Sequence, residues 1–442
     1  MATLSIIGII VGLVFLIATA WKGWSIYICG IGAAIIVMLF SGLNVLETLM
    51  GPFMSGFTTF VSNYLILFLI TTIFAKIMGD AGVAKVIAVK SASLIKRARP
   101  ELQPTLAVLV VVVVQLLLTY GGINAFVIIF LMAALCKDIF KELNLPWRLY
   151  MLAGFSTATI TVSMLPGTPA IQNLIPTNYL GTTAMAAPMM GLICSVVCFV
   201  LEMAYATFVM RRVVARGEGF LPSGQVIDSR ENVKMDYETA NYNVLYCLVP
   251  CIVLLVLMNI IGWSPTAAMT AACVLAVIMF HKTLPWKQLP ATIKAGCENA
   301  VSTCMNVSVV VGFGSVVAAT VGYSTIMGAL DMISGSPLLQ LVIAISVACG
   351  VSGSSSGGLT IGLNQFADKF LAMGLDPQII HRVSCIASTG LDTLPHNAGV
   401  LVAYEVAGLK YSQAYIHTFV ECCIIPIFIT ALAVVLAMVG IV

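Results

Sequence analysis

The side chains best suited to chemistry gather in four glycine- or proline-rich stretches. These are "YGGIN" at 120–124, "LPGTPAIQN" at 165–173, "SGSSSGG" at 352–358 and "DTLPHN" at 392–397. They offer mainly hydroxyl and amide groups, which give neutral hydrogen bonds suited to a small carboxylate that also bears hydroxyl groups. The expected substrate-binding residues are Gly122, Asn124, Thr168, Gln172, Asn173, Ser352, Ser354, Ser355, Ser356, Thr393, His396 and Asn397.

Two titratable side chains in the last stretch are candidates for proton coupling. Asp392 and His396 are four residues apart and flank Pro395. A carboxylate beside an imidazole can exchange protons in the physiological pH range. Two alternatives remain open: His396 only donates a hydrogen bond to substrate while Asp392 caps a helix, or backbone carbonyl oxygens hold Na⁺ instead.

The composition places the chain among polytopic α-helical membrane proteins. Of its 442 residues, 60% are hydrophobic and 9% charged, and long apolar runs recur from end to end. The 13 cysteines are scattered through these runs, so we expect buried thiols and no metal site, disulfide or other cofactor. The expected spans are 5–20, 24–40, 59–78, 148–177, 183–210, 241–261, 265–280, 300–325, 379–407 and 412–440.

The four stretches fall into two matched pairs, which predicts an internal repeat. Each half carries a glycine-rich turn between two apolar arms, followed by a helix that Leu-Pro interrupts. Broken spans at matching positions of inverted repeats are typical of secondary transporters and mark their binding sites. We therefore expect an all-α fold of two inverted-topology repeats, each with about five spans, one re-entrant helical hairpin and a helix broken at mid-membrane. The first repeat is 1–210 (hairpin 102–140, broken helix 148–177), a cytoplasmic linker follows at 211–240, and the second repeat is 241–442 (hairpin 337–373, broken helix 379–407).

The distribution of basic residues predicts the orientation. With both termini outside, every Lys and Arg except Lys369 and Arg382 falls on the cytoplasmic side, as the positive-inside rule requires. No Lys or Arg stands in the binding motifs, so helix ends and neutral donors are expected to hold an anion. Glu202 and Glu421 are expected near span ends, where water solvates them, and His381 is given no role.

"GGINAFV", "LPGTPAIQNLIPT", "SGSSSGGL" and "TGLDTLPHNAGVL" together resemble the gluconate permease family of the ion transporter superfamily, closest to its 3-hydroxybutyrate permease branch. The resemblance covers nearly the whole chain. It implies proton-coupled uptake of small hydroxy-carboxylates across a bacterial inner membrane, by a homodimer whose hairpins and broken helices move as an elevator. Gluconate or another short organic anion as substrate, and Na⁺ as coupling ion, remain alternatives. No nucleic acid is an expected partner.

The same residues allow two other interpretations, each from a different functional class. "GSSSG" at 353–357 matches the nucleophile motif of serine hydrolases, with Asp392 and His396 following, but that motif belongs in a strand–turn–helix context. Hairpins and broken helices also build channels. The paired repeat favours alternating access over both, so we expect a transporter and not an enzyme.

Overall fold

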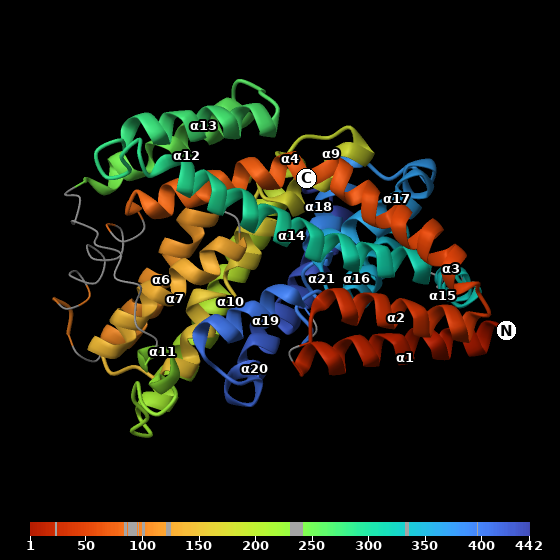
Figure 1. Cartoon of the computed structure of the whole chain (residues 1–442), viewed down its shortest axis with the longest axis horizontal. Coiled ribbons are helices and arrows are strands. Elements are labelled where there is room, and N and C mark those ends of the chain that lie inside the picture. The colour runs from red at the N-terminus through yellow and green to blue at the C-terminus, as the bar shows by residue number, and fades with distance from the viewer. Residues whose placement is uncertain are drawn as a thin grey trace.

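A computed structural model describes residues 1–22, 24–83, 86, 95, 97–99, 102–120, 125–229, 242–331, 336–395 and 397–442. These residues form helices and connecting turns, and no strand occurs among them. The helices pack into one elongated body with α1 and α2 at one end (Figure 1). The all-α class expected from the composition is confirmed.

The first half of the chain forms the following elements. Pro188 begins the last of them, where its missing N–H costs no helical hydrogen bond. In order they are α1 (Ala2–Trp21), α2 (Ile26–Ser41), α3 (Val45–Thr48), η1 (Leu49–Phe53), α4 (Met54–Asp80), α6 (Gln103–Tyr120), α7 (Ala125–Glu142), η3 (Trp147–Leu149), α8 (Tyr150–Gly154), η4 (Ile160–Met164), α9 (Ile171–Leu180) and α10 (Pro188–Val214).

The second half begins with a short helix and has an order of elements that is consistent with a repeat of the first. Proline again opens several of its helices. The elements are α11 (Gln225–Ser229), α12 (Val244–Asn259), α13 (Pro265–Met279), α14 (Leu289–Ala318), α15 (Val321–Asp331), α16 (Pro337–Ser352), α17 (Ser355–Ala372), α18 (Pro377–Ala387), α19 (Ala398–Ala407), α20 (Tyr411–Phe419), η5 (Val420–Ile424) and α21 (Ile425–Met438).

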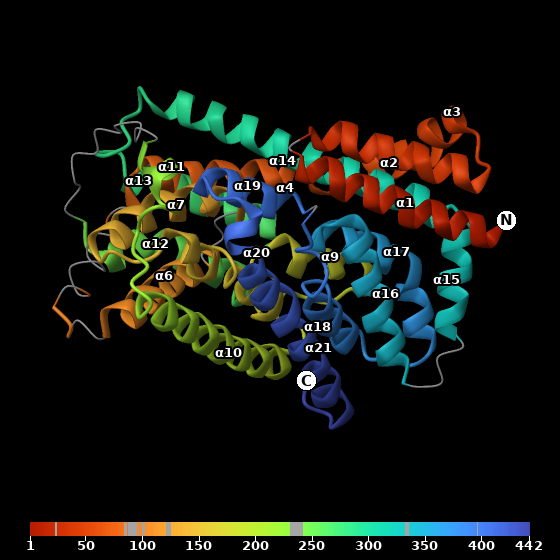
Figure 2. The same ribbon diagram turned by 90° about the horizontal axis from the view of Figure 1, so that it is seen from below.

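Helix pairings across the two halves follow the order that a repeat requires. The long helices α4 and α14 lie against each other (Figures 1 and 2). Helix α2 packs on α14, and its counterpart α13 packs on α4. In the same way α9 packs on α17, and α19 packs on α7. Each half is therefore completed by elements of the other half, a pattern consistent with the expected repeat.

The apolar helices fall into a long and a short group, and length alone does not separate the hairpin arms from the expected spans α2, α12 and α13, which have 15 or 16 residues. Five apolar stretches in the described residues are long enough to cross a membrane: Ala2–Thr19, Val45–Asp80, Pro188–Ala215, Leu289–Ala318 and Tyr411–Met438. The hairpin arms α6, α7, α16 and α17 have 16 to 18 residues, which is about 24–27 Å of helix. That is shorter than the hydrocarbon core of roughly 30 Å.

The expected span 300–325 differs from what the structure shows. Helix α14 begins earlier, at Leu289, and ends at Ala318, and α15 is a separate helix. The side chain of Thr320 accepts a hydrogen bond from the backbone N–H of Tyr323 at 3.1 Å. This N-cap begins a new helix direction, and the apolar run that continues through it hid the boundary in the sequence.

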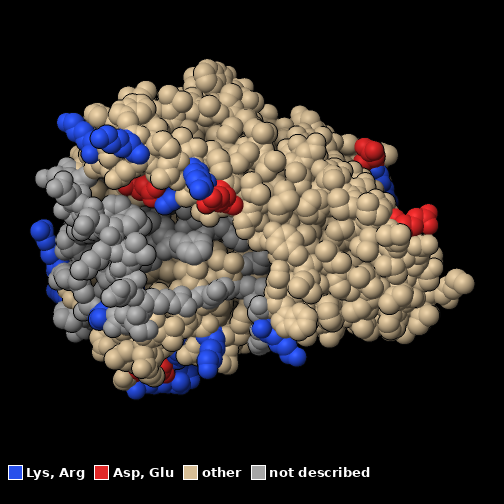
Figure 3. Space-filling model, viewed as in Figure 1, with Lys and Arg blue, Asp and Glu red and all other residues tan. Residues whose placement is uncertain are grey.

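Charged residues are rare on the broad face of the molecule shown in Figure 3, where most atoms belong to uncharged side chains. Lys and Arg gather mainly at one end and along one edge of that view. Apolar side chains such as Leu39, Ile66, Leu192 and Phe428 are exposed. A multi-pass membrane protein needs such a surface, because its solvent is lipid.

The α16–α17 hairpin depends on a glycine at its closest approach. Gly353 turns the chain with a φ of +60°, and a Cβ on Gly358 would lie 2.3 Å from Cα of Cys349. We predict that Gly358→Ala destabilises the protein by about 1–3 kcal/mol, as overpacking does. Thermal unfolding of the purified protein measures this. Gly79→Ala is the matched control, because no atom lies within 4 Å of its added methyl, and an equal loss in both variants would contradict the prediction.

Candidate functional site

The first break lies inside the expected broken helix 148–177. Helix α8 ends at Gly154, η4 is a π-helical turn, and Leu165 then takes an extended conformation that leads to α9. Extended backbone between two short helices leaves carbonyl groups without helical partners. In a membrane protein such groups must be satisfied by the protein itself.

Asn173 donates some of the hydrogen bonds that these carbonyl groups need. Its side chain is fully buried, and its Nδ2 donates to the carbonyl oxygens of Thr168 and Ala184, each at 2.9 Å. Its Oδ1 accepts from Nη1 of Arg382 at 3.0 Å and lies 3.3 Å from Nε2 of His381. All the hydrogen-bonding capacity of this amide is therefore used within the protein.

His381 is locked in one tautomer by its neighbours. An amide oxygen only accepts hydrogen bonds, so Nε2 carries the proton that reaches Asn173. Nδ1 then accepts from the hydroxyl of Thr182 at 2.7 Å. The imidazole is fully buried and joins α18 of the second half to the first break.

Arg382 is the largest polar group at the first break, and it too is fully buried. Nε donates to the carbonyl of Ala186 at 3.0 Å, and Nη1 donates to the carbonyl of Met164 at 3.3 Å and to Asn173. Nη2 donates to the carbonyls of Ala184 and Ala186 at 3.1 and 2.8 Å. These bonds use all five N–H groups of a guanidinium.

The sequence expectation that no cation stands at the breaks was therefore wrong. Arg382 was expected outside the membrane core as one of two basic residues on that side. Its acceptors are neutral, and none of the ion pairs found in the described residues includes it. The guanidinium thus brings an uncompensated positive charge to the first break.

Helix α10 comes close to this guanidinium because of one glycine. A Cβ on Gly191 would lie 2.7 Å from the carbonyl oxygen of Met164 and 3.2 Å from Nε of Arg382. A larger residue would separate α10 from the break. The glycine therefore lets the backbone of α10 cover Arg382 and exclude water from it.

Asn397 holds the second break in a similar way. Helix α18 ends at Ala387, and α19 begins at Ala398. Nδ2 of Asn397 donates to the carbonyls of Asp392 and Gly353, each at 2.9 Å, and Oδ1 accepts from the N–H of Val400. Asn173 and Asn397 each bond to the carbonyl five residues earlier, so the two breaks share one local design.

Both breaks contact the tip of the second hairpin, and Gln172 makes the contact from the first break. Its Nε2 donates to Oγ of Ser355 at 3.0 Å. Gln172 stands in the first turn of α9, and Ser355 is the first residue of α17. The bond from Asn397 to Gly353 brings the start of α19 to the same hairpin tip. Three helix N-termini, with the positive ends of their dipoles, therefore gather at one place.

Asp392 lies at this junction, within hydrogen-bonding reach of Ser355. The carboxyl is 7% exposed, and its Oδ1 has no hydrogen-bond partner. A buried carboxyl oxygen without a partner is costly in a static site. Its position at the N-terminal end of α17 is the place where the helix dipole favours a negative charge.

The hairpin serines build the tip. Ser352 lies 3.0 Å from the carbonyl of Ser354, and Ser354 accepts from the N–H of Gly357 and lies 3.2 Å from Ser356. These bonds hold the turn and the N-cap of α17. The serines are therefore brought to the junction, as the sequence predicts.

The remaining predicted residues differ in position. Thr168 is fully buried and accepts from the N–H of Ala170 at 3.3 Å. Thr393 donates to the carbonyl of Cys422 at 3.2 Å, so its hydroxyl is directed toward η5. Gly122, Asn124 and His396 lie outside the described residues.

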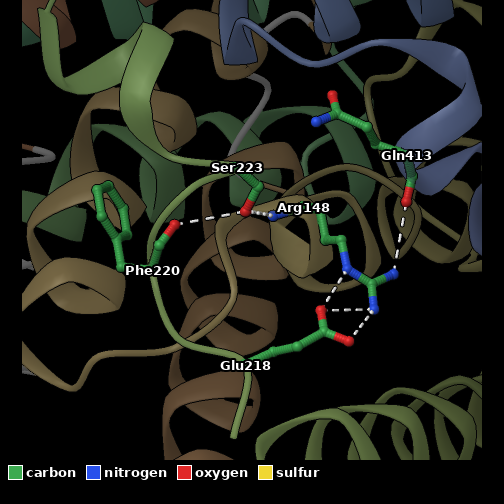
Figure 4. A network of polar contacts seen from close by, with 5 residues as sticks. All are labelled: Arg148, Glu218, Phe220, Ser223 and Gln413. Carbon is green, nitrogen blue, oxygen red and sulfur yellow. Dashed lines mark hydrogen bonds and ion pairs between the residues drawn. The ribbon is translucent and has the colours of Figure 1, made fainter.

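A separate polar network fixes the start of the first broken helix (Figure 4). Arg148 donates through Nε and Nη2 to the carboxylate of Glu218, at 2.9 and 3.1 Å, and its backbone N–H bonds to Ser223. Nη1 reaches the carbonyl of Gln413 in α20 at 3.5 Å. The described part of the linker is thereby attached to the first break and to the second half.

Comparisons with known proteins agree with this architecture. No family model matches the chain. Over 456 residues it is 29% identical to the "uncharacterized transporter YxjC" of Bacillus subtilis (strain 168), covering 94% of this chain and 95% of that protein. The chain resembles a transporter over almost its whole length. It also matches the crystal structure of the Alcanivorax borkumensis YdaH transporter, described as having an unusual topology, with a TM-score of 0.51 and 12% identity over 90% of this chain and 89% of that one.

The sequence analysis missed the buried charged residues around the breaks. His381 and Arg382 interrupt the apolar run of α18, and Glu202 and Glu421, expected near solvated span ends, are fully buried. An ionisable residue inside an apolar run is a signal of function. That signal was present in the sequence, but error in the span boundaries placed these residues at the ends.

We predict that Arg382→Lys lowers the stability of the folded protein by several kcal/mol. Lysine has three donors where arginine has five, and each buried carbonyl left without a partner costs about 1–3 kcal/mol. Arg212→Lys is the matched control, because Arg212 is exposed at the end of α10. Thermal unfolding of both variants measures the difference. Equal stability of Arg382→Lys and the wild type would contradict the role given to the guanidinium.

Proposed function

We propose that the protein is a secondary active transporter that imports a small hydroxy-carboxylate, similar to 3-hydroxybutyrate, together with protons. The observation that carries the proposal is the meeting of both breaks at the tip of the second hairpin, where Gln172 of the first break contacts Ser355 at 3.0 Å and Asn397 of the second break contacts Gly353 at 2.9 Å. Broken helices that meet across two repeats are the usual location of a transporter's binding site. The similarity to YxjC, a named transporter, supports the same class of function.

The electrostatics at this junction favour an anion. The N-termini of α9, α17 and α19 bring positive dipole ends together, and positive ends repel one another unless negative charge lies nearby. Arg382 adds a full positive charge behind the first break. Because all its donors are bound to the protein, it attracts an anion through its field and leaves direct contact to neutral groups.

Neutral donors at the junction suit a substrate with hydroxyl groups. Gln172 and Ser355 are joined by a hydrogen bond. A substrate that breaks this bond can form hydrogen bonds with both side chains. Its carboxylate is placed toward the helix N-termini, and its hydroxyl toward the serines of the hairpin tip. Asn173 and Asn397, whose amide hydrogens hold backbone carbonyls, keep the shape of the site.

Asp392 supplies a reason for proton coupling. When ionised, its carboxylate competes with the substrate for the same helix N-termini. A proton on Asp392 removes that competition, so substrate and proton bind together. His396 is the second proposed member of this coupling pair. Sodium held by carbonyl oxygens is the alternative, and gluconate or another sugar acid is the alternative substrate.

The transport cycle proposed here is of the elevator type. The crossed pair α4 and α14, with α2 and α13 packed on it, forms the scaffold that stays in place. The hairpins and broken helices move against it as one unit and carry the site across the membrane. We propose a homodimer in a bacterial inner membrane, with both termini outside.

Ligand binding gives the first test of this proposal. Purified protein is heated with a panel of 3-hydroxybutyrate, gluconate, other hydroxy-acids and dicarboxylates. We predict stabilisation by a short hydroxy-acid, which at 100 times its Kd amounts to about 2.7 kcal/mol. The absence of stabilisation by every anion in the panel would count against a carboxylate site.

Transport by variants gives the second test. In proteoliposomes, Gln172→Ala is expected to reduce uptake of the stabilising acid at least tenfold, because it removes a donor from the junction. Gln225→Ala, in the exposed helix α11, is the control and should transport normally. Uptake is expected to rise when the outside is made acidic, and a rise with a sodium gradient alone would favour the alternative ion. Normal uptake by Gln172→Ala would remove the junction from the mechanism.

A further inference from the structure

Two glutamates on matching helices of the two halves lie side by side behind the breaks. Glu202 is in α10, and Glu421 is in η5, next to α21, which packs on α10 (Figure 2). Both side chains are 0% exposed, and their carboxyl groups are near enough to interact electrostatically. The proposed transport mechanism described above uses neither of them.

These carboxyl groups have few hydrogen-bond donors. Oε1 of Glu202 lies 3.2 Å from the hydroxyl of Thr159 and 3.4 Å from Sγ of Cys198. Oε2 of Glu202 and both oxygens of Glu421 have no hydrogen-bond partner. The Ser156 hydroxyl lies near Glu421 but donates to the carbonyl of Met151 at 3.1 Å. Three carboxyl oxygens of the two side chains are thus buried without a partner.

Within the part of the chain that the structure describes, no ion pair offsets the two carboxyl groups. Among the described residues, no Lys, Arg or His forms an ion pair with either of them. The basic groups on adjacent elements are committed elsewhere: Arg148 to Glu218, Arg382 to carbonyls, and His381 to Asn173. The other titratable groups near the pair are Cys198, Cys422 and Tyr205, and Tyr205 in turn contacts His417 at 3.0 Å.

Two adjacent ionised carboxylates in such a place would be very costly. Burial disfavours each charge, and each charge disfavours the other. A bound hard cation would need a shell of several oxygen ligands, whereas the side chains around the pair include the thiols of Cys198 and Cys422. Among the described residues, no group of three or more metal-binding side chains occurs. A proton is the ligand that fits.

We infer that Glu202 and Glu421 form a buried proton-binding site that carries a proton with the substrate. Because this inference adds a second proton-binding site to the one proposed at Asp392, it rests on the proposed transport function. The pair holds at least one proton as a carboxylic acid O–H, so that the two carboxyl groups are not both ionised. The proton is bound from one side of the membrane and released to the other, and the two carboxyl groups titrate as a unit.

The pair is connected to both breaks, which gives it a means of coupling. Thr159, which contacts Glu202, immediately precedes the π-helical turn η4 of the first break. Thr393, at the second break, donates to the carbonyl of Cys422, the residue after Glu421 in the π-helical turn η5. Single π-helical turns often occur at functional sites. A shift of either break on substrate binding therefore changes the donors available to the pair.

Infrared spectroscopy tests proton binding without any need for transport. The protonated carboxylic acids of the purified protein absorb in a band that shifts in D₂O. We predict that Glu421→Gln removes or moves a component of this band and that Glu202→Gln does the same. Glu298→Gln is the control, since Glu298 is exposed beside Lys294. Spectra of Glu202→Gln and Glu421→Gln identical to the wild type would overturn the inference.

Transport then tests coupling. We predict that Glu421→Gln still binds the substrate, measured as thermal stabilisation, and still exchanges it across the membrane. An inward proton gradient accelerates uptake by the wild type. In Glu421→Gln this acceleration is expected to be at least tenfold smaller, while in Glu298→Gln it is expected to be unchanged. Retention of that acceleration by both Glu202→Gln and Glu421→Gln would overturn the coupling role. If the infrared change is found but no anion is bound or transported, the proton site stands and the proposed substrate class fails.

Discussion

The structure depends on one constraint: a helix broken inside a membrane protein leaves carbonyl groups that only the protein can satisfy. At the first break, Arg382 and Asn173 bind the carbonyls of Met164, Thr168, Ala184 and Ala186. At the second, Asn397 binds those of Asp392 and Gly353. These side chains stabilise the breaks by binding their carbonyl groups. The breaks in turn place helix N-termini at a common junction.

The two breaks share one local pattern of hydrogen bonds but differ in how many side-chain hydrogen bonds hold them. The first is held by a guanidinium with five bonds from α18, an element of the other half. The second is held by one amide that is local to the break and its neighbouring hairpin. Acidic groups are distributed in a complementary way, with Asp392 at the junction and the Glu202–Glu421 pair behind it. Acidic and basic side chains are therefore both buried here, and none of the ion pairs found in the described residues joins them.

Much of the architecture followed from the sequence because apolar length and proline or glycine positions are local signals. Helices α16 and α17 adjoin at Gly353, and Leu165-Pro166 and Leu394-Pro395 both lie between helices, which is consistent with the pattern in the sequence. The partners of Arg382 could not be predicted, since they lie about 200 positions away in the chain. The same is true of Glu202 and Glu421, which belong to different halves and become neighbours only through the packing of α10 on α21.

The exchange of partners between halves has a consequence for how the chain is made. When residues 1–210 have left the ribosome, α4 lacks α13 and α14, and α7 lacks α19. The carbonyls of Met164, Ala184 and Ala186 then lack their hydrogen bonds to Arg382, because that residue is synthesised roughly 200 residues later. The first half therefore enters the bilayer before these polar groups have their final partners. It reaches its native structure only after the second half has been synthesised.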